Sequence, residues 1–213
     1  MKSLIVLEGN DGSGKSTVAR GLTNRLADEG IDAIYTREPG GSPRAEIIRQ
    51  IMLDTPCPLT QLWLMSASRT EHITTTILPA IRDGKVVICD RFMPSTYAYQ
   101  VAGGGVDLKI VNSVNNYIMQ HTGIEPILMH DCITVVLDTN FDTAYSRLMV
   151  KDRNVLDVVD RDRFNIQREA YLNLSRYHNM YAFHELKKHV PVIDTTQYTS
   201  VTQVINACYQ LVV

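Results

Sequence analysis

The sequence predicts an α/β fold in which a parallel sheet carries helices on both faces. Short apolar runs alternate with longer segments of helical periodicity along the whole chain, which is typical of this class. Residues 86–89 (Val-Val-Ile-Cys) are apolar without alternation, as expected for a strand that is covered on both faces. A glycine-rich segment at residues 9–14 lies between the first predicted strand and the first predicted helix.

The first half of the chain contains three of the predicted strands. Residues 2–8 form an apolar strand, and a helix over 16–29 is predicted because Val18, Leu22 and Leu26 recur four apart on one face. Proline and glycines break the chain after the second strand. The other elements expected here are a strand at 33–35, a loop at 36–41, helices at 44–53 and 59–82, and the strand at 86–89.

The second half continues the alternation. Three consecutive glycines at 103–105 predict a turn, and residues 151–163 are charged and irregular. The expected helices are 95–101, 108–120, 141–149, 164–188 and 201–211, and the expected strands are 133–137 and 191–193. Because no repeat, low-complexity tract or linker divides the chain, we expect a single domain over residues 1–213.

Composition and charge exclude several classes of protein. The chain has 213 residues, of which 45% are hydrophobic and 21% charged, so it is neither disordered nor fibrous. Its net charge is −2, which leaves no basic surplus for a nucleic-acid partner. The four cysteines form no C-x-x-C pair, which favours reduced thiols and a cytoplasmic protein. No apolar run approaches the roughly 20 residues that a membrane span needs.

Residues 9–16 (Gly-Asn-Asp-Gly-Ser-Gly-Lys-Ser) fit the phosphate-binding pattern G-x-x-x-x-G-K-[ST]. Glycines let the backbone turn its N–H groups toward phosphate oxygens, while Lys15 supplies charge and the Ser16 hydroxyl can hold Mg²⁺. A chance glycine turn is the alternative, but a strand before the loop and a helix after it favour a bound ATP or GTP with Mg²⁺. The candidate nucleotide-binding residues are Gly9, Asn10, Asp11, Gly12, Ser13, Gly14, Lys15, Ser16 and Thr17.

A GTPase is disfavoured among the proteins that carry such a loop. The chain lacks the N-K-x-D motif that reads guanine, and its nearest segment, residues 154–157, reads Asn-Val-Leu-Asp without the lysine.

Arg69 lies in the middle of the apolar face of the predicted 59–82 helix, beside Leu62, Ile73 and Ile77 at 100° per residue. A buried guanidinium must be paired or must face a cavity. Two interpretations remain open: an internal salt bridge with a core carboxylate, or an arginine that lines a ligand pocket and donates to a base or phosphate.

Asp90 and Arg91 follow the predicted strand 86–89 directly. Ligands of open α/β sheets bind beyond the carboxyl ends of strands, where an acid can hold Mg²⁺ and an arginine can clamp phosphate. A simple helix cap by Asp90 is the alternative. On the next helix, two pairs with i, i+4 spacing are suited to reading a base or sugar, unless they form a solvated face: Ser95 with Tyr99, and Thr96 with Gln100.

Residues 147–169 hold six basic and five acidic side chains. Such a run is usually a solvated face, but its place between two helices also suits a lid over the phosphates, approximately at 150–163.

Together these segments resemble the thymidylate kinase family over nearly the whole chain. The resemblance rests on residues 7–17, on 36–42 (T-R-E-P-G-G-S), on Arg69, on Asp90-Arg91-Phe92 with 95–100, and on the 103–105 turn. It implies a P-loop NTPase fold with a five-stranded parallel sheet, a homodimer, and transfer of phosphate from MgATP to dTMP. Because Gly12 stands in the loop and no arginine does, the chain is similar to the bacterial type, whose lid arginines supply transition-state charge.

The resemblance also implies roles for individual residues. Asp11 approaches the sugar 3′-OH and the waters of the metal, Arg69 reads thymine O4, and Thr96 stands where the family contacts N3. Tyr99 packs beneath the deoxyribose. The substrate-binding set is Glu38, Pro39, Arg49, Met65, Arg69, Arg91, Ser95, Thr96, Tyr99 and Gln100; the catalytic set is Asp11, Lys15, Arg91, Arg153 and Arg161; the metal ligands are Ser16 and Asp90.

The chain departs from the family pattern at two places. Met65 stands where the family usually has a phenylalanine that stacks on thymine, and the lid lacks a clean L-D-R-[IF]-E motif. Other activities therefore remain as alternatives: a kinase for another 5-substituted deoxyuridine monophosphate, a deoxynucleoside kinase, or a P-loop switch without catalysis. The arginine at the end of strand 86–89 argues against the last two.

Overall fold

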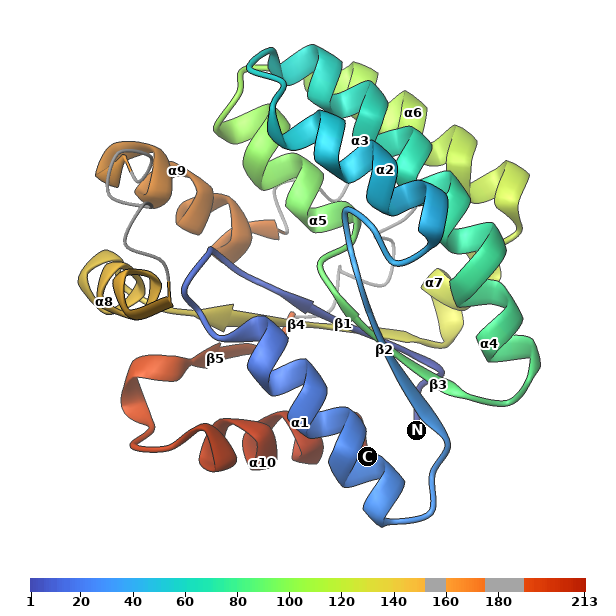
Figure 1. Ribbon diagram of the computed structural model, residues 1–213, viewed down its shortest axis with the longest axis vertical. Helices are drawn as coiled ribbons and strands as arrows, with labels where there is room; N and C mark the ends of the chain where they lie inside the picture. Colours follow the sequence, from blue (N-terminus) through green and yellow to red (C-terminus); the bar gives the residue numbers. More distant parts are fainter. Residues whose placement is uncertain (152–159, 175–189) are drawn as a thin grey trace.

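The computed structural model describes residues 1–151, 160–174 and 190–213 (Figure 1). Its centre is a five-stranded sheet in the order β2-β3-β1-β4-β5, in which every pair of neighbours is parallel. This arrangement confirms the predicted fold class. The strands are β1 (Leu4–Glu8), β2 (Ala33–Arg37), β3 (Val86–Asp90), β4 (Cys132–Asp138) and β5 (Val192–Asp194).

The helices connect these strands across both faces of the sheet. They are α1 (Lys15–Asp28), α2 (Pro43–Leu53), α3 (Pro58–His72), α4 (Leu78–Arg82), α5 (Met93–Thr96), α6 (Leu108–Thr122), α7 (Glu125–His130), α8 (Phe141–Lys151), α9 (Arg161–Leu172) and α10 (Val201–Val212). Two π-helical turns, η1 (Ile73–Ile77) and η2 (Tyr97–Ala102), and a 3₁₀ turn, η7 (Thr195–Gln197), complete the described elements.

Alternate side chains of β1 supply two separate cores. Leu4 and Val6 pack with α3, α4, α6 and α7 on one face, whereas Ile5 and Leu7 pack with α1 and α10 on the other. Figure 1 shows α1 and α10 together below the sheet and the larger helical group above it. Because β1 lies between two strands and two helical layers, its carboxyl end and the loop that follows are held firmly in place.

Local sequence explains where several helices begin. Ser42 caps α2 by accepting from the Ala45 N–H, and Pro43 occupies the first turn, where a missing N–H costs nothing. Asp160 caps α9 in the same way, so this helix starts at Arg161, three residues before the predicted start. Residues 161–163 are therefore helical rather than irregular. Helix α9 ends at Leu172, and residues 175–188 of the predicted helix lie outside the described residues.

The predicted 59–82 helix is α3, η1 and α4 in succession. Pro79 has no N–H and its ring would collide with the carbonyl four residues earlier, so the helix widens into a π-turn at this point. The sequence does not predict α7, because six residues are too few to establish a helical period.

Most of the predicted lid, including Arg153, lies outside the described residues. Within the described part of the chain, no helix is both long enough and apolar enough to cross a bilayer.

Candidate active site

The loop between β1 and α1 requires glycine at two positions. Gly9 has φ +138°, and a Cβ there would lie 2.2 Å from the carbonyl oxygen of Leu137 in β4. Gly12 has φ +81°, and its Cβ would lie 2.6 Å from the carbonyl oxygen of Ala144 in α8. The loop therefore lies directly against the backbone of both elements, and residues 11–16 line a cavity at the carboxyl end of the sheet.

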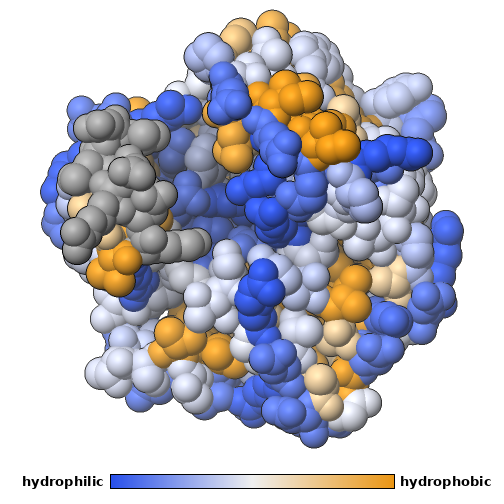
Figure 2. Space-filling model, viewed as in Figure 1, coloured by the Kyte–Doolittle hydropathy of each residue, from blue (hydrophilic) through white to orange (hydrophobic). Residues whose placement is uncertain are grey.

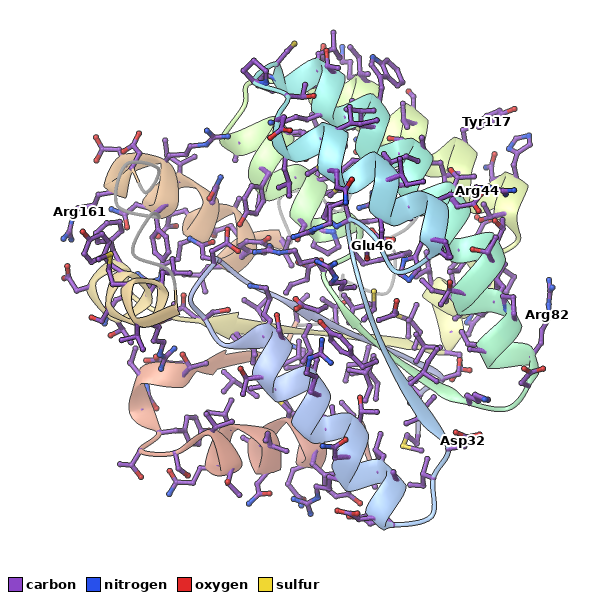
Figure 3. The ribbon with its side chains drawn as sticks, in the orientation of Figure 1. Asp32, Arg44, Glu46, Arg82, Tyr117 and Arg161 are labelled. Atoms are coloured by element: carbon purple, nitrogen blue, oxygen red, sulfur yellow. The ribbon has the colours of Figure 1, made fainter. Side chains whose placement is uncertain are left out.

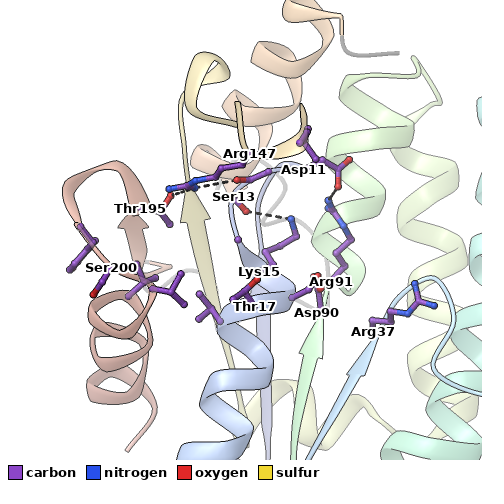
Figure 4. A pocket seen from close by; sticks show the side chains of 18 of the residues that line it. Asp11, Ser13, Lys15, Thr17, Arg37, Asp90, Arg91, Arg147, Thr195 and Ser200 are labelled. Atoms are coloured by element: carbon purple, nitrogen blue, oxygen red, sulfur yellow. Dashed lines mark hydrogen bonds and ion pairs between the residues drawn. The ribbon is translucent and has the colours of Figure 1, made fainter. Parts of the chain in front are cut away.

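Lys15 and Ser16 begin α1 beneath this loop. In Figure 4 the Lys15 side chain turns back toward the loop, where its Nζ donates to the Asn10 carbonyl at 2.7 Å and to Ser13 Oγ at 3.4 Å. Burial, together with the charge of Arg91, lowers the pKa of Lys15 to about 8. The negative charge of nucleotide phosphates would raise this pKa again.

Ser16 and Asp90 form a pair of oxygen donors suited to Mg²⁺. The Ser16 hydroxyl donates to Asp90 Oδ2 at 2.5 Å, and Asp90 Oδ1 is buried without a hydrogen-bond partner among the described residues. A buried, unpartnered carboxylate oxygen beside a hydroxyl is the kind of donor that Mg²⁺ takes together with phosphate oxygens. The predicted metal ligands thus lie together and fit the ion.

The guanidinium of Arg91 is the centre of a hydrogen-bond network. Arg91 follows β3 in a left-handed conformation (φ +74°), and its N–H donates to the Leu7 carbonyl at 2.9 Å, which aims the side chain toward the loop. The guanidinium donates to four side chains: Asp11 (2.7 Å), Tyr171 (2.8 Å), Tyr99 (3.0 Å) and Ser95 (3.1 Å). Partial burial raises the pKa of Asp11, but the charges of Arg91 and Lys15 outweigh it, so this pKa lies below its usual range.

Glu8, the last residue of β1, supports the network from below. One oxygen accepts from the Phe92 N–H at 2.7 Å, and the other accepts from Ser95 Oγ at 2.7 Å. Complete burial raises the pKa of Glu8 to about 7, although these hydrogen bonds oppose the change.

Helix α9 joins both the glycine-rich loop and Arg91. Asn10 Nδ2 donates to the Phe164 carbonyl at 2.8 Å, and the Tyr171 hydroxyl lies 2.8 Å from Arg91 and 2.9 Å from Ser95. Sequence reasoning missed Tyr171, because an aromatic residue inside a helix has the signature of a core residue.

Two cavities adjoin at Asp11 and Arg91. The first, of about 600 Å³, is lined by the loop, by Asp90, Arg91 and Arg147, and by residues 195 and 198–201 (Figure 4). The second, of about 510 Å³, lies under α2 and α3 and is lined by further polar and apolar side chains. Figure 2 shows that this face of the molecule is hollowed and that hydrophilic residues surround the hollow. A ligand in each cavity would meet its neighbour at Asp11 and Arg91.

The structure brings most of the predicted substrate-binding residues to the second cavity. Glu38, Pro39, Arg49, Met65, Arg91, Ser95, Tyr99 and Gln100 line it. Arg49 donates to the Pro39 carbonyl at 3.0 Å, which holds its guanidinium at the edge of both cavities. Three further residues line the cavities without having been predicted as site residues: Gln61 and Arg163 line the second cavity, and Arg147 lines the first. In the sequence these residues stand in a charged or a helical segment, and that position alone does not indicate a binding site.

Arg69 and Thr96 lie behind the cavity wall. Arg69 forms an ion pair with Glu38 at 2.7 Å and donates to Thr96 at 3.0 Å, to Asn115 at 3.3 Å and to the Phe92 carbonyl at 3.0 Å. Both Arg69 and Thr96 are fully buried. These contacts correspond to the internal salt bridge that the sequence left open, and the base-reading roles of the two residues stay predictions.

Of the two predicted lid arginines, the structure describes Arg161 alone, and Arg161 lines neither cavity. Arg153 falls outside the described residues. Arg161 lies at the outer edge of the molecule in Figure 3, where it pairs with Asp142 at 2.6 Å and packs over the ring of Phe141. Of the predicted catalytic residues, Asp11, Lys15 and Arg91 lie together, and Arg161 does not.

Comparison with known proteins identifies the family. A family model described as "Thymidylate kinase" matches residues 7–205. The chain is 38% identical over 180 residues to the thymidylate kinase of Symbiobacterium thermophilum, covering 83% of this chain and 81% of that protein. It is 34% identical over 212 residues to the thymidylate kinase of Finegoldia magna, covering 97% and 96%.

The chain belongs to the thymidylate kinase family. A solved structure supports this assignment: thymidylate kinase from Ehrlichia chaffeensis superposes with a TM-score of 0.71 at 26% identity, covering 99% of this chain and 97% of that one. Family membership confirms the P-loop NTPase fold and makes the chain a kinase that phosphorylates a nucleoside monophosphate. It does not favour the deoxynucleoside kinase or the P-loop switch that the sequence had left open.

Proposed function

We propose that this chain transfers the γ-phosphoryl group of ATP to the 5′-phosphate of dTMP, giving ADP and dTDP. The observation that carries this proposal is the meeting of two ligand-sized cavities at Asp11 and Arg91. In phosphoryl transfer the protein mainly aligns the two phosphates and neutralises their charge, and one arginine between two sites serves both purposes.

The first cavity is the proposed ATP site. The N–H groups of the loop bind phosphate oxygens, Lys15 reaches the β- and γ-phosphates, and Arg147 lies beside residues 195 and 198–201 where a base can stack. Ser16 and Asp90 would hold Mg²⁺, which neutralises the β- and γ-phosphates when bound. The loop itself contributes no arginine.

The second cavity is the proposed dTMP site. Arg91 and Arg49 bind the acceptor phosphate, Tyr99 packs beneath the sugar, and Gln100 faces the base with Met65 on the apolar side. The Tyr99 hydroxyl donates to Asp11 at 2.9 Å, which would hold the ring beneath the sugar, where it disfavours a ribose 2′-OH.

We further propose a homodimer, for which an apolar groove on α3 and α6 is the support. The groove measures about 380 Å³ and is lined by Trp63, Ala67, Val114, Tyr117 and Ile118, among others. Trp63 is 51% exposed and Tyr117 63% exposed, and Figure 3 shows Tyr117 projecting at the edge of the molecule. Exposed aromatic side chains around a groove are typical of a protein–protein contact.

The place of action that we propose is the cytoplasm. All four cysteines are free thiols, which suits a reducing compartment.

A coupled assay of ADP release tests the proposed reaction. The chain with MgATP is given dTMP, thymidine, dUMP, dCMP and dGMP in turn. Turnover highest with dTMP and absent with thymidine is expected, because thymidine lacks the phosphate that Arg91 binds. Preference for thymidine would contradict the proposal. Arg91→Ala should raise the KM for dTMP and lower kcat, because it removes the proposed contact with the acceptor phosphate. Arg44→Ala is its matched control, because Arg44 is exposed and pairs with Glu71 at 3.3 Å.

A further inference from the structure

The amide of Gln100 has an oxygen that no protein group satisfies. Gln100 is 4% exposed and lines the acceptor cavity, and its Oε1 has no hydrogen-bond partner among the described residues. A buried acceptor without a partner costs stability unless a ligand donates to it. The question is therefore what keeps the oxygen, rather than the NH₂ group, in this position.

A chain of hydrogen bonds answers this question. The backbone carbonyl of Thr55 can only accept, so the contact with Gln61 at 2.7 Å must come from Gln61 Nε2. That bond leaves Gln61 Oε1 as the acceptor facing Gln100, whose Nε2 donates to it at 3.2 Å. The amide of Gln100 is therefore fixed with its oxygen on the other side.

We propose that Gln61 is a specificity-determining positioning residue, which fixes the Gln100 amide so that its oxygen accepts from the base. The inference rests on the proposed function, because it assumes that the base of the acceptor nucleotide lies in this cavity. Gln61 acts through Gln100 and needs no contact of its own with the base.

A fixed acceptor on Gln100 distinguishes bases by the hydrogen-bonding group that they carry at N3. Thymine and uracil present N3–H, a donor, whereas cytosine presents a lone pair at N3. A fixed acceptor oxygen on Gln100 can accept from N3–H of thymine or uracil. With cytosine the same oxygen faces the N3 lone pair, so two acceptors oppose each other. A free glutamine amide could turn over and donate to cytosine, because its two ends have nearly the same shape. Gln61 therefore supports rejection of dCMP.

The test compares two substitutions at Gln61. Gln61→Leu removes the fixed acceptor and frees the Gln100 amide. The ratio of kcat/KM for dTMP to that for dCMP should fall about tenfold or more, mainly through a gain with dCMP. Gln61→Glu keeps an acceptor that cannot donate, so the ratio should stay within about threefold of wild type, whatever happens to stability. Gln210→Leu, an exposed glutamine on α10, is the matched control.

A purely structural role for Gln61 gives a different result. In that case Gln61→Leu reduces kcat/KM for both substrates in equal proportion, and the proposal is overturned. The double variant Gln61→Leu with Gln100→Leu supplies a second measurement: the effect of Gln61 on the ratio should vanish once Gln100 is absent. If Gln61→Leu fails to fold, Gln61→Met, which also lacks the acceptor, takes its place with the same expected ratio.

Failure of the proposed function is distinguishable from failure of this inference. A wild-type chain that turns over none of the pyrimidine monophosphates contradicts the function itself. A wild-type chain that strongly prefers dTMP, with a ratio that Gln61→Leu leaves unchanged, contradicts only the role of Gln61.

Discussion

The hydroxyl of Tyr171 lies 2.8 Å from a guanidinium nitrogen of Arg91, although 80 residues separate them in the chain. Tyr171 belongs to α9, whose first three residues overlap the end of the predicted lid, whereas Arg91 directly follows β3. The contact therefore ties the helix behind the lid to the arginine that joins the two proposed phosphate sites. Since Tyr171 also lies 2.9 Å from Ser95, its hydroxyl holds two members of the acceptor site at once.

Tyr171→Phe should therefore raise the KM for dTMP and lower kcat, with a combined loss in kcat/KM of about threefold to tenfold. A single hydrogen bond to a charged group contributes about 1.5 kcal/mol, and Arg91 keeps its other partners. The KM for ATP should change little. Steady-state kinetics with each substrate varied in turn checks this result, and Tyr209→Phe, whose hydroxyl bonds Glu29 on the surface, is the control. If only the KM for ATP rises, Tyr171 acts on the ATP site and not on the dTMP site.

Whether the sequence predicts a part of this site depends on how far apart in the chain the contacting residues are. The glycine-rich loop, Lys15 and the strand-end pair Asp90-Arg91 are predictable, because local spacing alone fixes where they lie. The partner of Arg69 is not, since its burial is visible in the helical period but Glu38 reaches it from another element 31 residues away. The same limit hides Tyr171.

Arg161 and Arg163 show a second limit of sequence-based prediction, which is the residue at which a helix begins. Arg161 and Arg163 are two residues apart, so on a helix they point in nearly opposite directions. A helix that begins at Arg161 turns Arg163 to the cavity and Arg161 outward. The sequence predicts an irregular segment at both residues, and an irregular segment has no defined face to which either side chain can be assigned.

This difference gives a matched pair of variants. Arg163→Ala should lower kcat by about tenfold or more, because an arginine near the transferred group can be worth 10³-fold and other arginines here share the task. Arg161→Ala should change kcat less than twofold, since the contacts it loses, an exposed ion pair with Asp142 and the packing over Phe141, lie away from both cavities. Single-turnover rates at saturating ATP and dTMP make the comparison. Equal losses in the two variants would mean that Arg161 also reaches the phosphates during turnover.

Lys15→Ala should lower kcat by about 10²- to 10³-fold while the fold stays intact. Lys15 is the charge within reach of the β- and γ-phosphates, and a single electrostatic donor is worth about 3–4 kcal/mol in a transition state. Thermal unfolding establishes that the variant folds. Lys85→Ala is the control, because Lys85 makes a long surface ion pair with Asp32 at 3.8 Å. Near-normal turnover by a folded Lys15→Ala protein would contradict the kinase mechanism.

Glu8 gives a prediction about pH. Burial raises its pKa from 4.5 to about 7, so the folded chain holds this proton more tightly than the unfolded chain does. The resulting stabilisation is complete below pH 4.5 and is lost as the pH rises through 7, by about 3 kcal/mol in total. Glu8→Gln cannot titrate. Its free energy of unfolding should therefore fall less than that of the wild type between pH 5 and pH 8.5.

Urea unfolding at these two pH values measures that difference. The comparison uses only the change between the two pH values, so any effect of the substitution that is independent of pH cancels. Parallel changes in the two proteins would show that Glu8 is already ionised at pH 5, held by the three groups that donate to it: the N–H groups of Phe92 and Ser95 and the Ser95 hydroxyl.

Met65 gives the last prediction, which concerns the base. Its side chain is 5% exposed and lines the acceptor cavity with Met52 and Leu53, so the apolar side of the cavity is built from flexible side chains. An aromatic ring contributes about 0.5–1.5 kcal/mol beyond its buried area and holds a base in one orientation, whereas a thioether adapts to its neighbour. Met65→Phe should therefore sharpen discrimination between dTMP and other 5-substituted deoxyuridine monophosphates by about threefold to tenfold. The measurement is kcat/KM for dTMP, dUMP and 5-hydroxymethyl-dUMP in both proteins, with thermal unfolding to establish that the larger ring fits. If every ratio stays the same in a folded variant, Met65 does not contact the base, and the base must lie on the Gln100 side of the cavity alone.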